Sequence, residues 1–188
     1  MRRIKLGIID DSVFCRNLTK LQLLNFDNVK FDFVLEAESI TDFQSKAKAI
    51  KMPDVILLDI MMPGIDGISG IPIIRQQFPE VHIIMLSDVD KPSIIRNCIL
   101  AGAYSFVKKG TKTCELVDII LDVLTGSCYA SPELTKSIFC GIQKSPQAVN
   151  KLSENIAKST KLTVDGLWEL INRILDKLNV PHQNSLIS

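Results

Sequence analysis

The chain has 188 residues, of which 46% are hydrophobic and 23% charged, and its formal net charge at pH 7 is +1. This composition argues against wholesale disorder, and the near-zero net charge excludes a strong general attraction to nucleic acid or anionic lipid. Charged residues or proline interrupt every apolar run before it reaches the roughly 18 to 20 residues that a membrane span requires, so we expect no membrane association.

Two features of the sequence favour a cytoplasmic protein. The apolar stretch that follows the basic start is too short for the core of a secretory signal and ends in two acids, so a buried strand is the better interpretation. The cysteines form no C-x-x-C pair and have apolar neighbours, which favours reduced thiols in a core; they are Cys15, Cys98, Cys114, Cys128 and Cys140.

The first two thirds of the chain alternate short apolar runs with amphipathic stretches, as parallel strands joined by crossover helices do. The expected strands are Lys5–Ile9, Phe31–Ala37, Val55–Asp59, His82–Ser87 and Ser105–Lys108. Helical spacing or helix-start chemistry marks Ser12–Leu24, Thr41–Ala49, Gly67–Phe78, Pro92–Ala101 and Cys114–Leu124. We predict an α/β fold with a five-stranded, doubly wound parallel sheet of the flavodoxin-like kind.

The alternation stops after about Gly126, where a second unit begins. We predict a first domain, a linker with a connecting helix that starts near Ser131, and a small all-α domain, over residues 1–126, 127–147 and 148–188. The last of these contains two expected helices, Val149–Lys158 and Thr163–Leu178.

Polar side chains follow four of the predicted strands. Asp10 and Asp11 follow the first strand, Asp59 ends the third, Ser87 ends the fourth and Lys109 follows the fifth. In open parallel sheets, ligands bind outside the carboxyl ends of the strands, so these side chains are expected at one site.

Carboxylates brought together repel one another and normally need a cation, and oxygen ligands without thiols point to Mg²⁺. The expected ligands are Asp11, Asp59 and the main-chain carbonyl of Met61, with Asp10 in support. The Asp59 carboxylate can then attack a phosphoryl donor, because Mg²⁺ and Lys109 offset charge on the transferred oxygens.

Each of these residues also has a plainer interpretation. Asp10 and Asp11 can cap the helix that follows them, Ser87 alone can be a turn residue, and Lys109 alone can be a solvated charge. Capping leaves Asp59 and Lys109 unexplained. The joint occurrence of the residues therefore favours phosphoryl chemistry, in which Ser87 donates a hydrogen bond.

Four segments of the first domain resemble the receiver domains of two-component response regulators. They are Ile-Ile-Asp-Asp-Ser, Asp-Val-Ile-Leu-Leu-Asp-Ile-Met-Met-Pro-Gly-Ile-Asp-Gly, Met-Leu-Ser and Ala-Gly-Ala-Tyr-Ser-Phe-Val-Lys-Lys. The resemblance implies that a sensor histidine kinase phosphorylates Asp59, that Ser87 and Phe106 form the switch, and that Lys109 rather than Lys108 is the site lysine. It also implies a homodimer on activation and a phosphoryl acceptor rather than a turnover enzyme.

Two residues depart from the family pattern. Asp88 follows Ser87 where a small residue is usual, and its charge is expected to slow phosphoryl transfer by repulsion. Pro72 lies inside the predicted helix Gly67–Phe78, where proline removes an amide donor and is expected to kink the helix.

Residues Leu152–Leu186 resemble a degenerate helix-turn-helix output domain of the LuxR type, which binds DNA. The resemblance rests on Ser-Glu-Asn-Ile-Ala-Lys, Leu-Thr-Val-Asp and Ile-Asn-Arg-Ile-Leu-Asp-Lys-Leu-Asn-Val, and on the tail Ser-Leu-Ile. It implies transcription control, with candidate nucleic-acid contacts at Lys158, Lys161, Thr163, Arg173 and Lys177.

Gly166, Trp168 and Glu169 stand where the family has basic and polar residues, and the first helix of the output domain is missing or shortened. The alternative hypothesis is therefore a protein-interaction or dimerisation module that does not bind DNA. Trp168 fits this alternative as an interface anchor, although it also fits the edge of a core.

Overall fold

The computed structural model describes residues 3–89 and 91–125. Contacts divide the chain into two units, Met1–Ser131 and Pro132–Ser188. The predicted connecting helix, the two predicted C-terminal helices and the small all-α domain lie outside the described residues. Within those residues, none of the helices combines the length and apolarity that crossing a bilayer requires.

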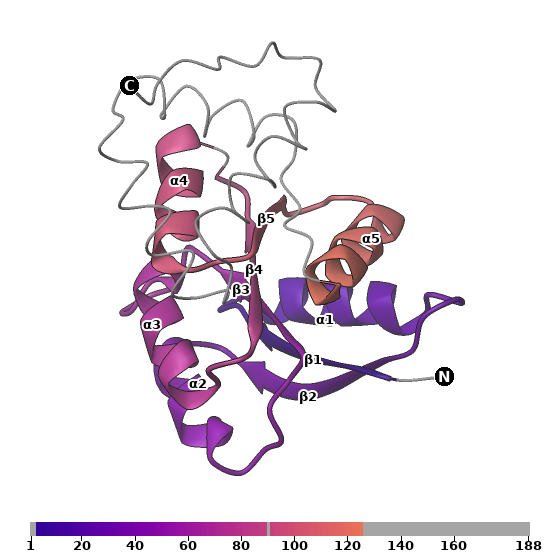
Figure 1. The fold of residues 1–188 in the computed structure, drawn as a ribbon, viewed down its shortest axis with the longest axis horizontal. Helices are drawn as coiled ribbons and strands as arrows, with labels where there is room; N and C mark the ends of the chain where they lie inside the picture. Colours follow the sequence, from indigo (N-terminus) through magenta and orange to yellow (C-terminus); the bar gives the residue numbers. More distant parts are fainter. Residues whose placement is uncertain (1–2, 90, 126–188) are drawn as a thin grey trace, which may run out of the picture. The chain divides into compact units, whose positions relative to one another are not determined.

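The described residues form a five-stranded parallel sheet in the order β2-β1-β3-β4-β5 (Figure 1). The strands are β1 (Ile4–Ile9), β2 (Phe31–Ala37), β3 (Val55–Asp59), β4 (His82–Ser87) and β5 (Ser105–Lys108). The helices that connect or follow them are α1 (Val13–Leu24), α2 (Ile40–Ala47), α3 (Gly67–Gln77), α4 (Pro92–Ala101) and α5 (Thr113–Leu124). The predicted doubly wound α/β fold is confirmed.

The sheet lies between two layers of helices. Helices α1 and α5 cover one face, and α2, α3 and α4 cover the other (Figure 1). Every residue of the central strand β3 is buried, because both faces of the sheet are covered. Since all five strands run in the same direction, their carboxyl ends meet at one edge, which brings Asp10, Asp59, Ser87 and Lys109 to the same side.

Helices α1, α2 and α3 begin after side-chain caps. Ser12 Oγ accepts a hydrogen bond from the Cys15 amide, and Ser39 Oγ accepts one from the Asp42 amide. Helix α2 begins at Ile40, directly after its Ser39 cap, and ends at Ala47. The helix predicted near Thr41–Ala49 is therefore present, but it starts one residue earlier and ends two residues earlier than predicted. Its first residue, Ile40, is fully buried.

The cysteines of the described residues do not all lie in the core, so the prediction of core thiols is partly wrong. Cys98 is buried on α4, and burial raises the pKa of its thiol to about 12. Cys15 on α1 is half-buried, and Cys114 on α5 is exposed. All three are free thiols.

Candidate functional site at the carboxyl ends of the strands

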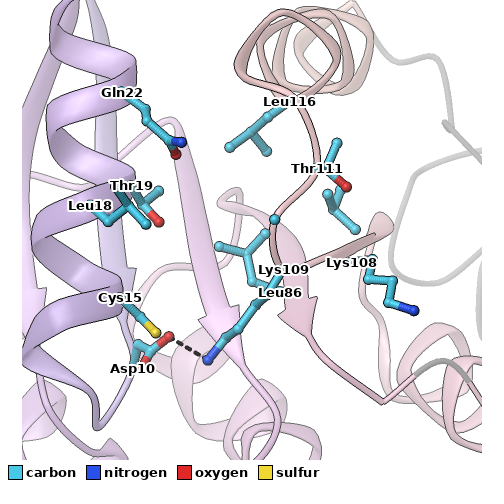
Figure 2. A pocket seen from close by; sticks show the side chains of 12 residues that line it. Asp10, Cys15, Leu18, Thr19, Gln22, Leu86, Lys108, Lys109, Thr111 and Leu116 are labelled. Carbon is cyan, nitrogen blue, oxygen red and sulfur yellow. Dashed lines mark ion pairs between the residues drawn. The ribbon is translucent and has the colours of Figure 1, made fainter.

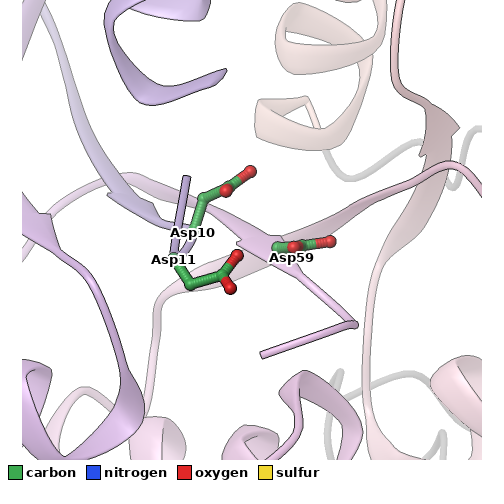
Figure 3. Close-up of side chains that lie close together, drawn as sticks. All are labelled: Asp10, Asp11 and Asp59. Atoms are coloured by element: carbon green, nitrogen blue, oxygen red, sulfur yellow. The ribbon is translucent and has the colours of Figure 1, made fainter. Parts of the chain in front are cut away.

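Three carboxylates come together beyond the ends of β1 and β3. Asp10, Asp11 and Asp59 each offer an oxygen, and these atoms lie within 4.8 Å of one another (Figure 3). Asp10 and Asp59 are only 2% and 4% exposed, whereas Asp11 is exposed. Two of the three negative charges are thus removed from water, which makes the cluster costly unless cations compensate for it.

Hydrogen bonds to the following segment hold Asp10 in place. The Ser12 amide donates to Asp10 Oδ1 at 2.8 Å, and the Arg16 guanidinium donates to the Asp10 main-chain carbonyl. Ser12 makes the cap of α1. The alternative in which Asp10 and Asp11 are the cap residues is therefore wrong, and both carboxylates are directed to the cluster (Figure 3).

Lys109 is the cation of the site. Its Nζ atom lies 2.7 Å from Asp10 Oδ2 and 3.0 Å from Asp59 Oδ2. Its amide donates to the Ser87 carbonyl at 3.0 Å, which ties the segment after β5 to the end of β4. The exposed Lys108 side chain points away from Asp10 (Figure 2), as the alternation of side chains in a strand requires.

The electrostatics of the site show a shortage of positive charge. Burial raises the pKa of Asp59, and the negative charge of Asp10 adds to the rise; the hydrogen bond and charge of Lys109 and a hydrogen bond from the Met61 amide oppose it. Burial by itself would lower the pKa of Lys109, but Asp10 and Asp59 outweigh it and raise the pKa. The ammonium therefore stays charged, and one cation serves two buried carboxylates.

Ser87 lies at the end of β4 and is fully buried. Its Oγ atom accepts a hydrogen bond from the Val89 amide at 3.1 Å, so the hydroxyl retains its own hydrogen to donate. Asp88, the unusual acid, is exposed. Phe106 is 6% exposed and pairs with Met85 across the β4–β5 ladder.

Gly67 shapes the segment after β3, a role that the sequence analysis missed. A Cβ atom at Gly67 would lie 1.9 Å from the Asp59 carbonyl oxygen, and the Gly67 amide donates to the Ile60 carbonyl at 2.9 Å. The start of α3 can therefore approach the end of β3 only if this residue is glycine. The Asp-Gly pair at 66–67, with Asp66 as the cap of α3, was the available signal.

This arrangement suits a hard divalent cation and an attack by an oxygen nucleophile. Asp10, Asp11 and Asp59 supply only oxygen ligands, and their charge exceeds that of Lys109. The Met61 side chain is 64% exposed, and its amide hydrogen-bonds to Asp59, so the main chain of this residue borders the site. The candidate nucleic-acid contacts Lys158, Lys161, Thr163, Arg173 and Lys177 lie outside the described residues.

Two response regulators are similar to this chain in sequence. The response regulator GacA of Pseudomonas syringae pv. syringae is 27% identical over 135 residues, which are 72% of this chain and 62% of GacA. The response regulator protein VraR of Staphylococcus aureus is 20% identical over 201 aligned positions, covering 98% of this chain and 94% of VraR.

Solved structures of response regulators are also similar to this chain. The RcsB response regulator of Salmonella typhimurium has a TM-score of 0.66 at 19% identity and covers 97% of this chain and 95% of its own. An RcsB–DNA complex gives a TM-score of 0.66 at 20% identity with the same coverage. At these identities the structures establish the fold alone.

The family assignment rests on a direct match over most of the first unit. Residues 6–121 match the response regulator receiver domain, and this range includes Asp10, Asp11, Asp59, Ser87 and Lys109. The chain belongs to the response regulator receiver family.

Proposed function

We propose that this protein is a two-component response regulator that accepts a phosphoryl group on Asp59 from a sensor histidine kinase. The observation that carries the proposal is the buried Asp59 carboxylate with the Lys109 ammonium 3.0 Å away and two further acids beside it. No single strand contributes all of these groups, so the sheet itself assembles the site.

In the proposed step an Asp59 carboxylate oxygen attacks the phosphorus of the donor. A P–O bond forms, and the bond from phosphorus to the donor's imidazole nitrogen, or to the acetate oxygen of acetyl phosphate, breaks. A Mg²⁺ ion held by Asp10, Asp11, Asp59 and the Met61 carbonyl would offset the charge of the transferred oxygens.

The protein's own groups would take the remaining charge. Lys109 is already held beside Asp59 by its ion pairs with Asp10 and Asp59, so it needs little movement to reach a phosphoryl oxygen. Ser87 would donate its hydroxyl hydrogen to a second oxygen, because its present hydrogen bond uses only the lone pairs. Movement of Ser87 and Phe106 would then carry the signal to the rest of the chain.

The proposal is tested by incubating the full chain with acetyl phosphate and MgCl₂ and weighing the intact protein. We expect a mass increase of one phosphoryl group that is absent in D59N and in EDTA. D88N is the matched control, because Asp88 is an exposed acid next to the site; it should react at least as fast as wild type. An unshifted wild-type mass would mean that the receiver fold here takes no phosphoryl group.

We further propose that the domain over residues 148–188, joined to the receiver domain by residues 127–147, controls transcription by binding DNA. Similarity to RcsB, whose complex with DNA is known, supports this over 97% of the chain. The candidate contacts are Lys158, Lys161, Thr163, Arg173 and Lys177. We also expect two copies to pair on activation.

A second candidate for this domain is a protein-interaction or dimerisation module. This candidate is favoured by the residues Gly166, Trp168 and Glu169. An aromatic residue and an acid stand at positions where contacts to phosphate are expected. Gel shifts with promoter fragments at rising salt separate the two functions. Affinity that falls steeply with salt supports DNA binding, and affinity that stays negligible at low salt supports the interaction module.

A further inference from the structure

Arg16 reaches back from helix α1 to the acids of the site. It is the fourth residue of the helix, and helical side chains lean toward the amino end, so its guanidinium extends toward the segment before the helix. There it donates a hydrogen bond to the main-chain carbonyl of Asp10. The Arg16 side chain makes no other hydrogen bond with the residues that the structure describes.

A cation at this position needs favourable contacts. The amino end of a helix carries a partial positive charge, which disfavours Arg16 there, and the side chain is half-buried. Besides the Asp10 carbonyl, Arg16 acts on Asp42 of α2. Burial by itself would raise the pKa of Asp42, but hydrogen bonds from Lys46 and a main-chain amide and the charges of Lys46 and Arg16 lower it. Arg16 is therefore close both to the acid cluster and to the start of α2.

The carbonyl that Arg16 holds belongs to the peptide unit between the two consecutive acids. The Asp10 carbonyl and the Asp11 amide share one plane, so a bond to the carbonyl also restrains the Asp11 main chain. Asp10 has further restraints of its own. Its Oδ1 atom accepts a hydrogen bond from the Ser12 amide, and its Oδ2 atom pairs with Lys109.

The Asp11 side chain has no such restraint. It is exposed and makes no hydrogen bond or ion pair within residues 3–89 and 91–125. Its oxygen nevertheless lies within 4.8 Å of oxygens of Asp10 and Asp59 (Figure 3). Like charges at this distance repel, so the main chain has to hold the Asp11 carboxylate in the cluster. The hydrogen bond from Arg16 restrains the main chain at this point.

We propose that Arg16 is a positioning residue for the divalent cation site: by holding the Asp10–Asp11 peptide, it keeps the Asp11 carboxylate where a Mg²⁺ ion needs it. A guanidinium has no lone pair to offer a metal, so Arg16 acts through the main chain and is not a ligand. Groups that orient metal ligands typically contribute roughly 10- to 100-fold in metal affinity. This inference rests on the proposed function, because it concerns the cation site of the proposed reaction.

The sign of the effect separates positioning from simple electrostatics. Arg16 carries a positive charge close to the acid cluster, so a role through charge alone means that its removal strengthens Mg²⁺ binding. In the positioning role, its removal lets the Asp11 carboxylate move away from Asp10 and Asp59, and Mg²⁺ binding weakens. The two roles therefore predict opposite changes in the dissociation constant of Mg²⁺.

Thermal unfolding of the full chain across a MgCl₂ series, without a phosphodonor, measures this dissociation constant, because an ion that binds the native state raises Tm. NaCl of equal ionic strength corrects for screening. We expect Arg16→Met to weaken Mg²⁺ binding about tenfold. Arg16→Ala is a second variant with high helix propensity and should do the same. Arg16→Lys keeps the charge and a donor and should restore most of the affinity, since the contact uses a single hydrogen bond.

Two further variants are controls. Lys20→Met removes the other cation of α1, which pairs with Glu36 on β2. Asp42→Asn removes the acid of α2 on which Arg16 acts, and it leaves the bond to the Asp10 carbonyl in place. Both should keep the wild-type affinity for Mg²⁺. Circular dichroism before heating shows whether each variant is folded.

Several outcomes overturn the proposal. Wild-type or tighter Mg²⁺ binding in Arg16→Met and Arg16→Ala excludes positioning, and an equal loss in Lys20→Met or Asp42→Asn assigns the effect to the packing of α1. The intact mass after treatment with acetyl phosphate reports phosphoryl transfer separately. A chain that gains no mass, but whose Mg²⁺ affinity depends on Arg16, supports this inference and overturns only the phosphoryl proposal.

Discussion

The Lys109 Nζ atom lies 3.0 Å from Asp59 Oδ2 while it also lies 2.7 Å from Asp10 Oδ2. One ammonium thus joins the end of β5 to the ends of β1 and β3, and it offsets the charge of only one of two buried carboxylates. The stability and the chemistry of the site both depend on this imbalance.

Lys109→Met should destabilise the protein by about 3 kcal/mol, because it leaves two buried carboxylates without their cation. Lys112→Met is the control, since Lys112 is an exposed lysine nearby; it should change the free energy of unfolding by less than about 0.5 kcal/mol. Urea unfolding in EDTA at pH 7 measures both. Equal effects of the two substitutions would mean that the Lys109 ion pairs contribute little.

Asp59→Asn should stabilise the metal-free protein at neutral pH by about 1 kcal/mol, because it removes one of two carboxylates that compete for Lys109. The pKa of Asp59 is raised in the folded protein, so folding favours the protonated carboxyl. The wild-type protein therefore loses stability as the pH rises from the ordinary pKa of Asp through the raised one. The advantage of the variant should therefore vanish below about pH 3.9, the ordinary pKa of Asp.

Added MgCl₂ should narrow the difference between Asp59→Asn and wild type, because a cation that binds the native carboxylates stabilises wild type more. Thermal unfolding across pH, in EDTA and in MgCl₂, measures the effect. A variant that is less stable than wild type in EDTA at pH 7 would contradict the view that the site lacks positive charge.

Gly67→Ala should be more harmful than Gly70→Ala. A Cβ at Gly67 would lie 1.9 Å from the Asp59 main-chain oxygen, which cannot move without moving β3; at Gly70 it would lie 2.3 Å from the Cδ1 end of the Ile40 side chain. We expect a loss of about 2 to 3 kcal/mol for Gly67→Ala and a smaller one for Gly70→Ala. Urea unfolding measures the free energy of unfolding of both variants. A larger loss for Gly70→Ala than for Gly67→Ala would show that the start of α3 moves easily.

Pro72→Ala should stabilise the protein. Helix α3 runs from Gly67 to Gln77 through Pro72, which is exposed and has no amide to donate. Replacing an interior helical proline by alanine gains up to about 3 kcal/mol, reduced by the greater freedom of the unfolded chain. We expect a net gain of about 1 to 2 kcal/mol in urea unfolding; a loss would mean that α3 depends on the proline.

The sheet was well predicted because its signal is local. Strands buried on both faces need continuous apolar runs, and β2, β3, β4 and β5 have the predicted bounds, with β1 one residue longer than expected. Helix ends were less accurate, because they depend on which side chain caps the amides. At α2 the Ser39 hydroxyl decides the start, and the apolar spacing of Thr41–Ala49 did not reveal it.

The sequence alone determined which residues make up the site, because it sets which acids, hydroxyl and lysines follow the strands. In a parallel sheet these residues all lie at one edge. The resemblance already favoured Lys109 over Lys108. Only the tertiary structure decided that Lys109 pairs with two carboxylates at once, that Ser12 rather than Asp10 caps α1, and that Gly67 lies against Asp59. The reason is that chain order predicts which strand end carries a group, whereas the direction of a side chain depends on atoms brought together from distant parts of the chain.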